Sequence, residues 1–425
     1  MSVGPALPLP PAPRLAARRP PPVREPAPLP TTRSRVQPVV RWALYAYVCS
    51  IPFEMPQRSI PVEIPTLVGS VLLLATLLDR RAAYRRFPAP LTAFTLYLWV
   101  FVAASLVNLA SHELSVGKFF LEMLQALLLF WTTANLLADE PVRIGALRAL
   151  ALACGLRAAL QVAGFASTER ALWTGGYRVT ALGQNANLSA LILTAGLLAA
   201  LALPSYREAR RRWPVALRWS LVVLIAVAIV QTGSRGGLLA LAAGVMMFLV
   251  SGPTPWARVR NAATALLVLG LLGFAAYRSE AMRNRLFAAA EAGNLAGRER
   301  IYPALLIMIR ERPALGWGPV ENQYELERRL QDPGYVKRDA HNLVLELMTS
   351  TGVAGTIPFL IGLVLCVSSA WRARRTTRGV LPFAMLLAIL TGTMSGTWIA
   401  SKILWLVLAH GEAAGRGPAL AARGT

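Results

Sequence analysis

Cysteine and charge are both scarce in this chain, and each shortage excludes a class of protein. Among 425 residues there are three cysteines, Cys49, Cys154 and Cys366, each within an apolar run and without the spacing of metal ligands. We expect small buried side chains, not a disulfide framework or a metal site. Charged residues make up 15% of the chain and hydrophobic residues 55%, with a mean hydropathy of +0.48. A soluble protein of this length cannot bury so much apolar surface, so the composition predicts an all-α integral membrane protein.

Acidic residues are the scarcer of the two charged kinds. The chain has 44 Lys and Arg against 21 Asp and Glu, a net charge of +23. The basic residues cluster in short loops between apolar runs, as in the cytoplasmic loops of membrane proteins. We therefore attribute the charge to membrane topology and expect the lipid bilayer, not a nucleic acid, as partner.

Residues 1–37 are rich in proline, alanine and arginine and have no apolar period. Such a segment cannot form a core, and no apolar region follows at the distance typical of a signal peptide. We expect a disordered cytoplasmic tail over 1–37 and a second cytoplasmic tail over 411–425.

About twelve apolar segments lie between these tails, most near the roughly 17–25 residues needed to span hydrocarbon. They predict nine transmembrane helices over 38–277 and three over 341–410, separated by one long extracytoplasmic loop over 278–340. The last segment is short for a full span. The segments are at about 39–53, 62–78, 90–110, 117–137, 144–165, 186–203, 214–231, 236–251, 258–277, 341–367, 380–397 and 399–410.

Basic and weakly charged loops alternate along the chain. A cytoplasmic N-terminus puts the basic loops near 80–86, 207–212, 258–260 and 372–378 on the cytoplasmic side. The positive-inside rule thus predicts an N-in, multi-pass protein of the inner membrane.

The long loop contains a helical pattern over 301–309, where apolar residues follow the spacing of one helix face. Pro303 suits the first turn, and Pro313 and Gly316 end the pattern. The favoured interpretation is an amphipathic helix resting on the membrane interface.

Arg235 is a candidate phosphate ligand at the outer end of the 214–231 segment. A charge at this depth is costly unless it faces a cavity or an anion, and a guanidinium fork matches phosphate oxygens. Ser234 adds a donor, and Gly236 and Gly237 leave room for a ligand near the backbone. The alternative is an arginine that reaches the lipid headgroups. The order of residues does not match the hydrolase elbow, so Ser234 is not a nucleophile candidate.

Arg178 lies in the predicted loop 166–185, where the alternative is an exposed loop charge. Asn185 and Asn187 come directly before the next apolar segment. For these asparagines we favour helix capping.

His341 ends the long loop and begins an apolar helix. Imidazole titrates near 6.5 and can accept a proton from a hydroxyl, although a lone histidine at a membrane boundary is often a polar interface residue. Asn342 and Glu346 share one helical face, and Asp339 is two residues before the histidine. Either acid is suited to orient the imidazole. The other two histidines, His112 and His410, have no such neighbours and are interpreted as polar interface residues.

Together these stretches resemble the O-antigen ligase and polysaccharide polymerase superfamily over about residues 175–360. The matching motifs are Arg178 before a Gly/Asn-rich stretch, Ser234-Arg235-Gly236-Gly237, Gly297-Arg298, Pro313-Ala314-Leu315-Gly316-Trp317-Gly318, His341-Asn342 with Glu346, and Thr351-Gly352-Val353-Ala354-Gly355.

The resemblance implies a GT-C-like helical architecture and an inverting glycosyltransferase that needs no metal or cofactor. It implies a glycan on undecaprenyl pyrophosphate as donor and a lipid-core, protein or glycan hydroxyl as acceptor, at the outer face of the inner membrane. Arg178 and Arg235 would bind the pyrophosphate, and His341 would act as general base. The supporting residues would be Ser234, Gly236, Gly237, Arg298, Asn342 and Glu346.

Two other functions use the same residues. A transporter or channel for a sugar or anion would bind its substrate with the arginines, but the chain has no internal repeat of the kind that builds many transporters. A non-catalytic scaffold of a polysaccharide assembly complex is the third alternative. The motifs do not separate a ligase from a polymerase.

Overall fold

The computed structural model describes residues 35–55, 63–108, 112–170, 177–203, 214–249, 251–252, 254–279, 282–284, 297–331, 336–376 and 378–416. All of them belong to the unit formed by residues 34–425. Most of the predicted tails and part of the long loop lie outside the described residues.

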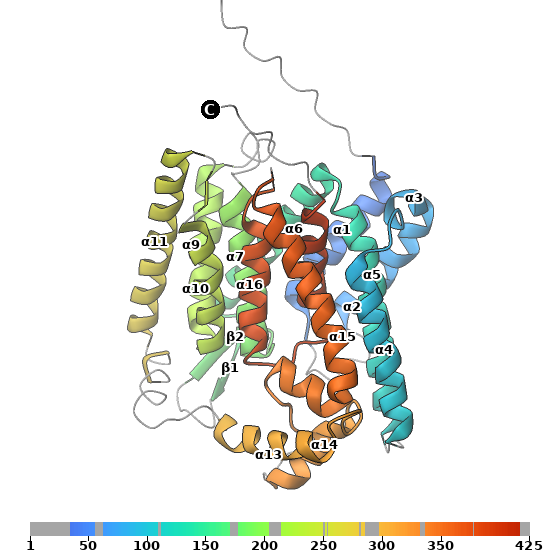
Figure 1. Cartoon of the computed structure of the whole chain (residues 1–425). Coiled ribbons are helices and arrows are strands. Elements are labelled where there is room, and N and C mark those ends of the chain that lie inside the picture. Colours follow the sequence, from blue (N-terminus) through green and yellow to red (C-terminus); the bar gives the residue numbers. More distant parts are fainter. Residues whose placement is uncertain are drawn as a thin grey trace, which may run out of the picture. The chain divides into compact units, whose positions relative to one another are not determined.

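A helix overlaps each of the twelve predicted segments, and these helices form a bundle (Figure 1). Their bounds are α1 Pro38–Ser50, α2 Ile64–Thr76, α4 Ala89–Val107, α5 Glu113–Leu136, α6 Glu140–Val162, α7 Ala186–Ala202, α9 Val215–Gln231, α10 Arg235–Leu249, α11 Pro255–Arg278, α15 Leu343–Ala373, α16 Leu381–Thr393 and α17 Lys402–Ala414. Short turns η1 Ile51–Phe53, η2 Leu77–Asp79 and α3 Arg80–Ala83 follow α1 and α2.

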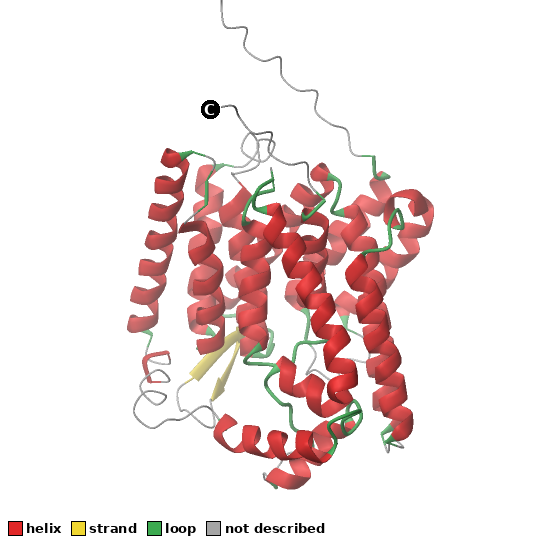
Figure 2. Cartoon of the chain, in the orientation of Figure 1, coloured by secondary structure: helices red, strands yellow, loops and turns green. Residues whose placement is uncertain are grey.

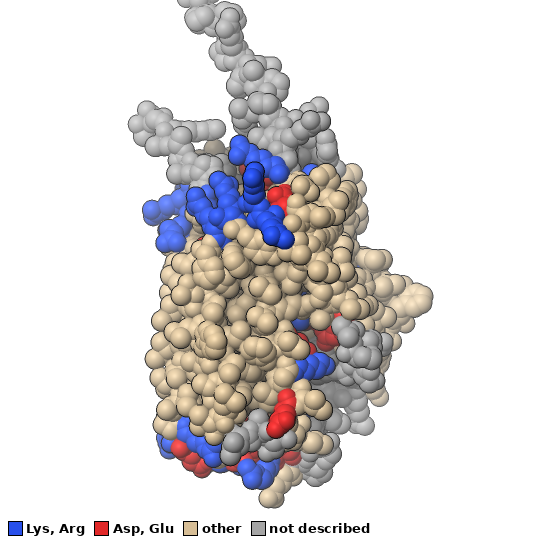
Figure 3. All heavy atoms as spheres, turned by 90° about the vertical axis from the view of Figure 1, so that its right-hand side faces the viewer, with Lys and Arg blue, Asp and Glu red and all other residues tan. Residues whose placement is uncertain are grey.

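Within the described ranges, five helices are long and apolar enough to cross a membrane: α4, α5, α6, α11 and α15. Helices α7, α9, α10 and α16 are also apolar but have only 13–17 residues each. The face in Figure 3 agrees with this, because charged residues gather near its two ends and a broad band between them is largely uncharged. The helical membrane architecture is therefore confirmed, and twelve crossings remain a prediction.

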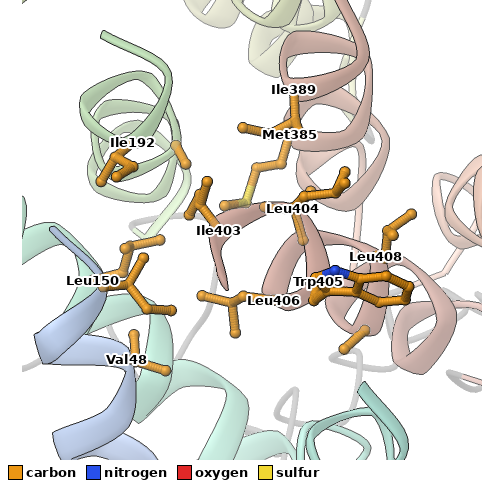
Figure 4. Packing of buried hydrophobic residues seen from close by; sticks show 14 of the residues in the cluster. Val48, Leu150, Ile192, Met385, Ile389, Ile403, Leu404, Trp405, Leu406 and Leu408 are labelled. Atoms are coloured by element: carbon orange, nitrogen blue, oxygen red, sulfur yellow. The ribbon is translucent and has the colours of Figure 1, made fainter. Parts of the chain in front are cut away.

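The last helix lies at the centre of the bundle. Every residue of α17 is buried. With 13 residues the helix is short for a full membrane span, so the sequence did not show how it packs. Figure 4 shows Trp405 and its neighbours on α17 packed among side chains of α1, α6, α7 and α16. Because all its faces contact protein, α17 needs no lipid-facing surface and can be short.

Helix α15 is broken at Gly352, whose backbone lies at φ 62° and ψ −164°. The break exposes backbone groups that the loop segment 313–318 satisfies. Trp317 N donates to Thr349 O at 2.7 Å, and Val353 N donates to Pro313 O at 2.8 Å. An added Cβ at Gly352 would lie 2.3 Å from Ala314 O, so only glycine fits this crossing. The break therefore anchors the long loop to α15.

The long loop contains two described helices, α13 Arg298–Glu311 and α14 Glu321–Leu330. The predicted helix over 301–309 is confirmed. Its apolar face, however, packs against protein and not against the membrane interface. Its buried members Ile301, Leu305 and Met308 pack with Leu326, Leu330 and Ala340, chiefly against α14. The apolar stripe is explained by a small second core under the loop.

Candidate functional site

Arg178 lies on a β-hairpin that the sequence did not indicate. Strands β1 Ala166–Arg170 and β2 Tyr177–Ala181 pair antiparallel beside the bundle (Figure 2). From β2, Arg178 Nε donates to Thr232 O at 3.0 Å, and Nη2 donates to Asn187 Oδ1 at 2.8 Å. Thr232 is the C-cap of α9, where a cation is stabilised by the unpaired carbonyls of a helix end. Arg178 is thus a half-buried, anchored residue and not an exposed loop charge.

Asn187 connects two of the predicted site residues. Its Oδ1 accepts from Arg178 Nη2 and, at 2.9 Å, from Ser234 Oγ. The helix cap of α7 is Asn185, whose Oδ1 accepts from the backbone N of Asn187 and of Leu188. The expected cap by one of these two asparagines is therefore confirmed, and it is Asn185. No local sequence pattern indicates this role of Asn187, because its partners are 9 and 47 residues away along the chain.

Ser234 and the two glycines set the start of α10. Ser234 is buried, and its Oγ accepts from Gly237 N at 3.1 Å as a helix cap. An added Cβ at Gly237 would lie 2.3 Å from Ala190 Cβ, and one at Gly236 would lie 2.3 Å from Ser395 Oγ. The space beside the two glycines, expected to accept a ligand, is therefore filled by protein atoms in this structure. These close approaches bring α10 against α7 and against the loop 394–401.

Two guanidinium groups come together at the start of α10. Arg235 is its first residue, and its electrostatic neighbours are Arg298 and Glu299 at the start of α13. Arg298 Nη2 donates to Ser395 O at 3.0 Å. Arg298 Nε is buried and has no hydrogen-bond partner in the described part of the chain. An arginine N–H group without a partner, near a second guanidinium, is suited to bind an anion such as a phosphate.

His341 lies within the electrostatic reach of Arg298. Its backbone lies in the left-handed region at φ 51°, just before Asn342 caps α15 by accepting from Val344 N and Leu345 N. Burial lowers the pKa of His341 below its ordinary value of 6.5. Asp339 raises this pKa in part, while Arg298 and Arg338 lower it further. The imidazole is therefore neutral at neutral pH and able to accept a proton.

The two acids near His341 have different roles. Exposed Asp339 acts on the imidazole through its charge. The buried carboxylate of Glu346 accepts from Asn322 Nδ2 at 2.9 Å. Glu346 therefore fastens the start of α15 to α14.

His112 also has a defined partner, which corrects the expectation that it lacks neighbours. Its Nδ1 lies 3.0 Å from Glu321 Oε1, and its ring stacks on Tyr324 with centroids 3.5 Å apart. His112 precedes α5, so these contacts hold α14 against the α4–α5 turn. His410 is buried within α17 inside the bundle, so its interpretation as a polar interface residue is wrong.

The predicted site residues thus lie at one end of the bundle. Figure 1 places the hairpin, α13 and α14 at the same end. The links run from Arg178 through Asn187 to Ser234, and from Gly236 through Ser395 to Arg298.

The comparisons agree with this geometry. A family model described as O-Antigen ligase matches residues 220–360, which contain Arg235, Arg298 and His341 but not Arg178. No curated protein matches the chain. This match and the motifs within it confirm the resemblance of residues 220–360 to the O-antigen ligase and Wzy-type superfamily.

Proposed function

We propose that this protein transfers or polymerises a glycan from undecaprenyl pyrophosphate onto an acceptor hydroxyl at the outer face of the inner membrane. The observation that carries the proposal is the grouping of Arg235, Arg298 and a neutral His341 in the region of the O-antigen ligase match. Basic groups suit the diphosphate, and a neutral imidazole suits the acceptor.

The proposed reaction is a single displacement. His341 takes the proton of the acceptor hydroxyl as its oxygen attacks the anomeric carbon of the donor. The bond from that carbon to the diphosphate oxygen breaks, and the electron pair leaves with the diphosphate. Arg178 and Arg235 stabilise the developing charge without a metal ion. Attack opposite the leaving group inverts the anomeric centre.

Helix lengths support a site at the depth of lipid phosphates. Helix α10 has 15 residues and α7 and α9 have 17 each, whereas α5 has 24 and α15 has 31. At about 1.5 Å per residue, α10 is about 22 Å long, shorter than a hydrocarbon core of about 30 Å. The ends of these short helices carry the site, so we place it at the depth of the lipid phosphates. A lipid diphosphate can thus reach the arginines while its chain stays in the bilayer.

Acceptor-dependent release of undecaprenyl pyrophosphate tests the enzyme against the transporter. In nanodiscs, an enzyme releases one lipid pyrophosphate for each glycan transferred. For a ligase, release stops when the acceptor is omitted; for a polymerase, the lipid-linked glycan is itself the acceptor, and release accompanies growth of the glycan. A transporter forms no free lipid pyrophosphate under either condition.

The pH profile tests the assignment of His341. A general base is active when deprotonated, and burial lowers its pKa, so the acid limb of the transfer rate should lie below pH 6.5. Asp339→Asn removes a charge that raises this pKa, so the limb should move to still lower pH. The measurement is the transfer rate from about pH 4.5 to 8 at saturating donor. If the acid limb does not move in Asp339→Asn, the pH profile is not set by the titration of His341.

The orientation is tested by thiol labelling in intact cells. Arg375 and Arg310 are exposed on the segments expected inside and outside, respectively. We expect a membrane-impermeant maleimide to label Arg310→Cys and not Arg375→Cys, with the native protein as baseline for its own three cysteines. The reverse pattern would invert the topology and place the arginines on the cytoplasmic face.

A further inference from the structure

We propose that the loop 394–401, between α16 and α17, forms a subsite for the sugar ring attached to the donor diphosphate. Its polar contacts are the Trp398 indole N–H and the Thr397 hydroxyl. The proposal rests on the proposed function and assigns the part of the donor that the arginines do not bind.

The loop borders both helices that carry the neighbouring arginines. Ser395 O accepts from Arg298 Nη2 at 3.0 Å, at the start of α13. A Cβ added to Gly236, at the start of α10, would lie 2.3 Å from Ser395 Oγ, so the serine hydroxyl packs directly against this glycine. The loop residues directly after Ser395 therefore lie next to the proposed diphosphate site.

The Trp398 indole folds back toward this junction. An added Cβ at Gly396 would lie 2.3 Å from Trp398 Nε1, so the indole nitrogen lies beside Gly396, the residue after Ser395. Both Trp398 Nε1 and Thr397 Oγ1 are buried, and neither has a hydrogen-bond partner within the described ranges. Arg298 Nε at the same junction is in the same condition.

A second tryptophan shows that this is not a general property of the segment. Trp405, seven residues later, donates from Nε1 to Ile399 O at 2.7 Å. A buried indole N–H normally has such a partner, and a buried polar atom without a protein partner is available to pair with water or a bound ligand.

A pyranose ring fits these atoms better than the other parts of the substrate. Its hydroxyls can pair with the indole N–H and the threonine hydroxyl, and its apolar face can lie on the indole. A polyprenyl chain has no group to pair with them, and phosphate oxygens are already matched by guanidinium groups. The first sugar is bonded directly to the diphosphate, so it must lie next to the arginines.

Binding of two lipids to conservative variants tests the subsite. The probes are undecaprenyl pyrophosphate and the same lipid carrying one sugar, measured with the full chain in nanodiscs. Trp398→Phe and Thr397→Val each remove one polar group and keep most of the volume. We expect each to weaken binding of the glycosylated lipid about threefold to tenfold, as for one lost hydrogen bond, and to leave the sugar-free lipid unaffected.

Trp371→Phe is the matched control, because Trp371 stacks on Arg374 near the far end of α15. It should bind both lipids like the native protein. Native affinity of Trp398→Phe and Thr397→Val for the glycosylated lipid would overturn the subsite. Equal weakening for both lipids would also overturn it and would assign the loop to the diphosphate. A change confined to the acceptor KM would place the sugar of the acceptor there instead. If the native protein binds neither lipid, the proposed function itself fails.

Discussion

Arg235→Ala should lower the rate of glycan transfer by roughly 10²–10³-fold, the usual cost of removing one donor that stabilises transition-state charge. Arg235 and Arg298 are electrostatic neighbours, and the starts of their helices are joined through Ser395. When one guanidinium is removed, the other alone must stabilise the negative charge of the diphosphate. Arg235→Lys keeps the charge but loses the two-point fork, so its rate should fall between those of the native and alanine proteins.

The control is Arg260→Ala, an exposed arginine on α11 near its first turn. It should transfer glycan at the native rate. Rates are measured with purified proteins at matched amounts in nanodiscs. A native rate for Arg235→Ala would make Arg235 a residue that only reaches the lipid headgroups.

Loss of His341 should reduce the transfer rate by roughly 10²–10⁴-fold, the range for a positioned general base. His341 lies at φ 51°, where alanine is strained and asparagine is tolerated. His341→Asn is therefore the better variant, because it removes the base and keeps the backbone. Donor binding should persist, since Arg178 and Arg235 are unchanged. A loss of rate with retained binding identifies a group that acts in the transition state.

His112→Asn is the matched histidine control. Its partners are Glu321 and Tyr324, which hold α14, so its effect should appear in thermal stability more than in rate. A native rate in His341→Asn would remove His341 from the chemistry and leave the two arginines as a binding site only.

The apolar helices were predictable because their hydrophobic runs are set by local sequence. The site motifs were predictable for a different reason: glycines, arginines and a histidine are unusual at the ends of apolar segments. The hairpin over 166–181 was missed, because its strands are polar and short and sit against helix ends. The packing of α17 was also missed, since complete burial depends on what surrounds a helix.

The roles of Asn187 and Glu346 show the limit of local reading. Both were placed correctly near helix starts, but their function depends on partners brought in by the fold. Asn185 or Asn187 was expected to cap α7; Asn185 does so, and Asn187 joins Arg178 to Ser234. Glu346 was a candidate to orient the imidazole, and its observed partner is Asn322 on α14. The apolar face of α13 was assigned to lipid because its protein partner was not recognised. Helix α14 has few apolar residues, so its sequence does not indicate a second core.

Glycan transfer by the purified chain tests the central claim most directly. The native protein, Arg235→Ala and His341→Asn are placed in nanodiscs with a lipid-pyrophosphate glycan and a chelator. Lipid-core, protein and glycan acceptors are supplied in separate reactions, and the products are resolved by mass. We expect product from the native protein with at least one acceptor, at a rate unaffected by the chelator, and strongly reduced product from both variants. No product from the native protein with any acceptor would contradict a glycosyltransferase.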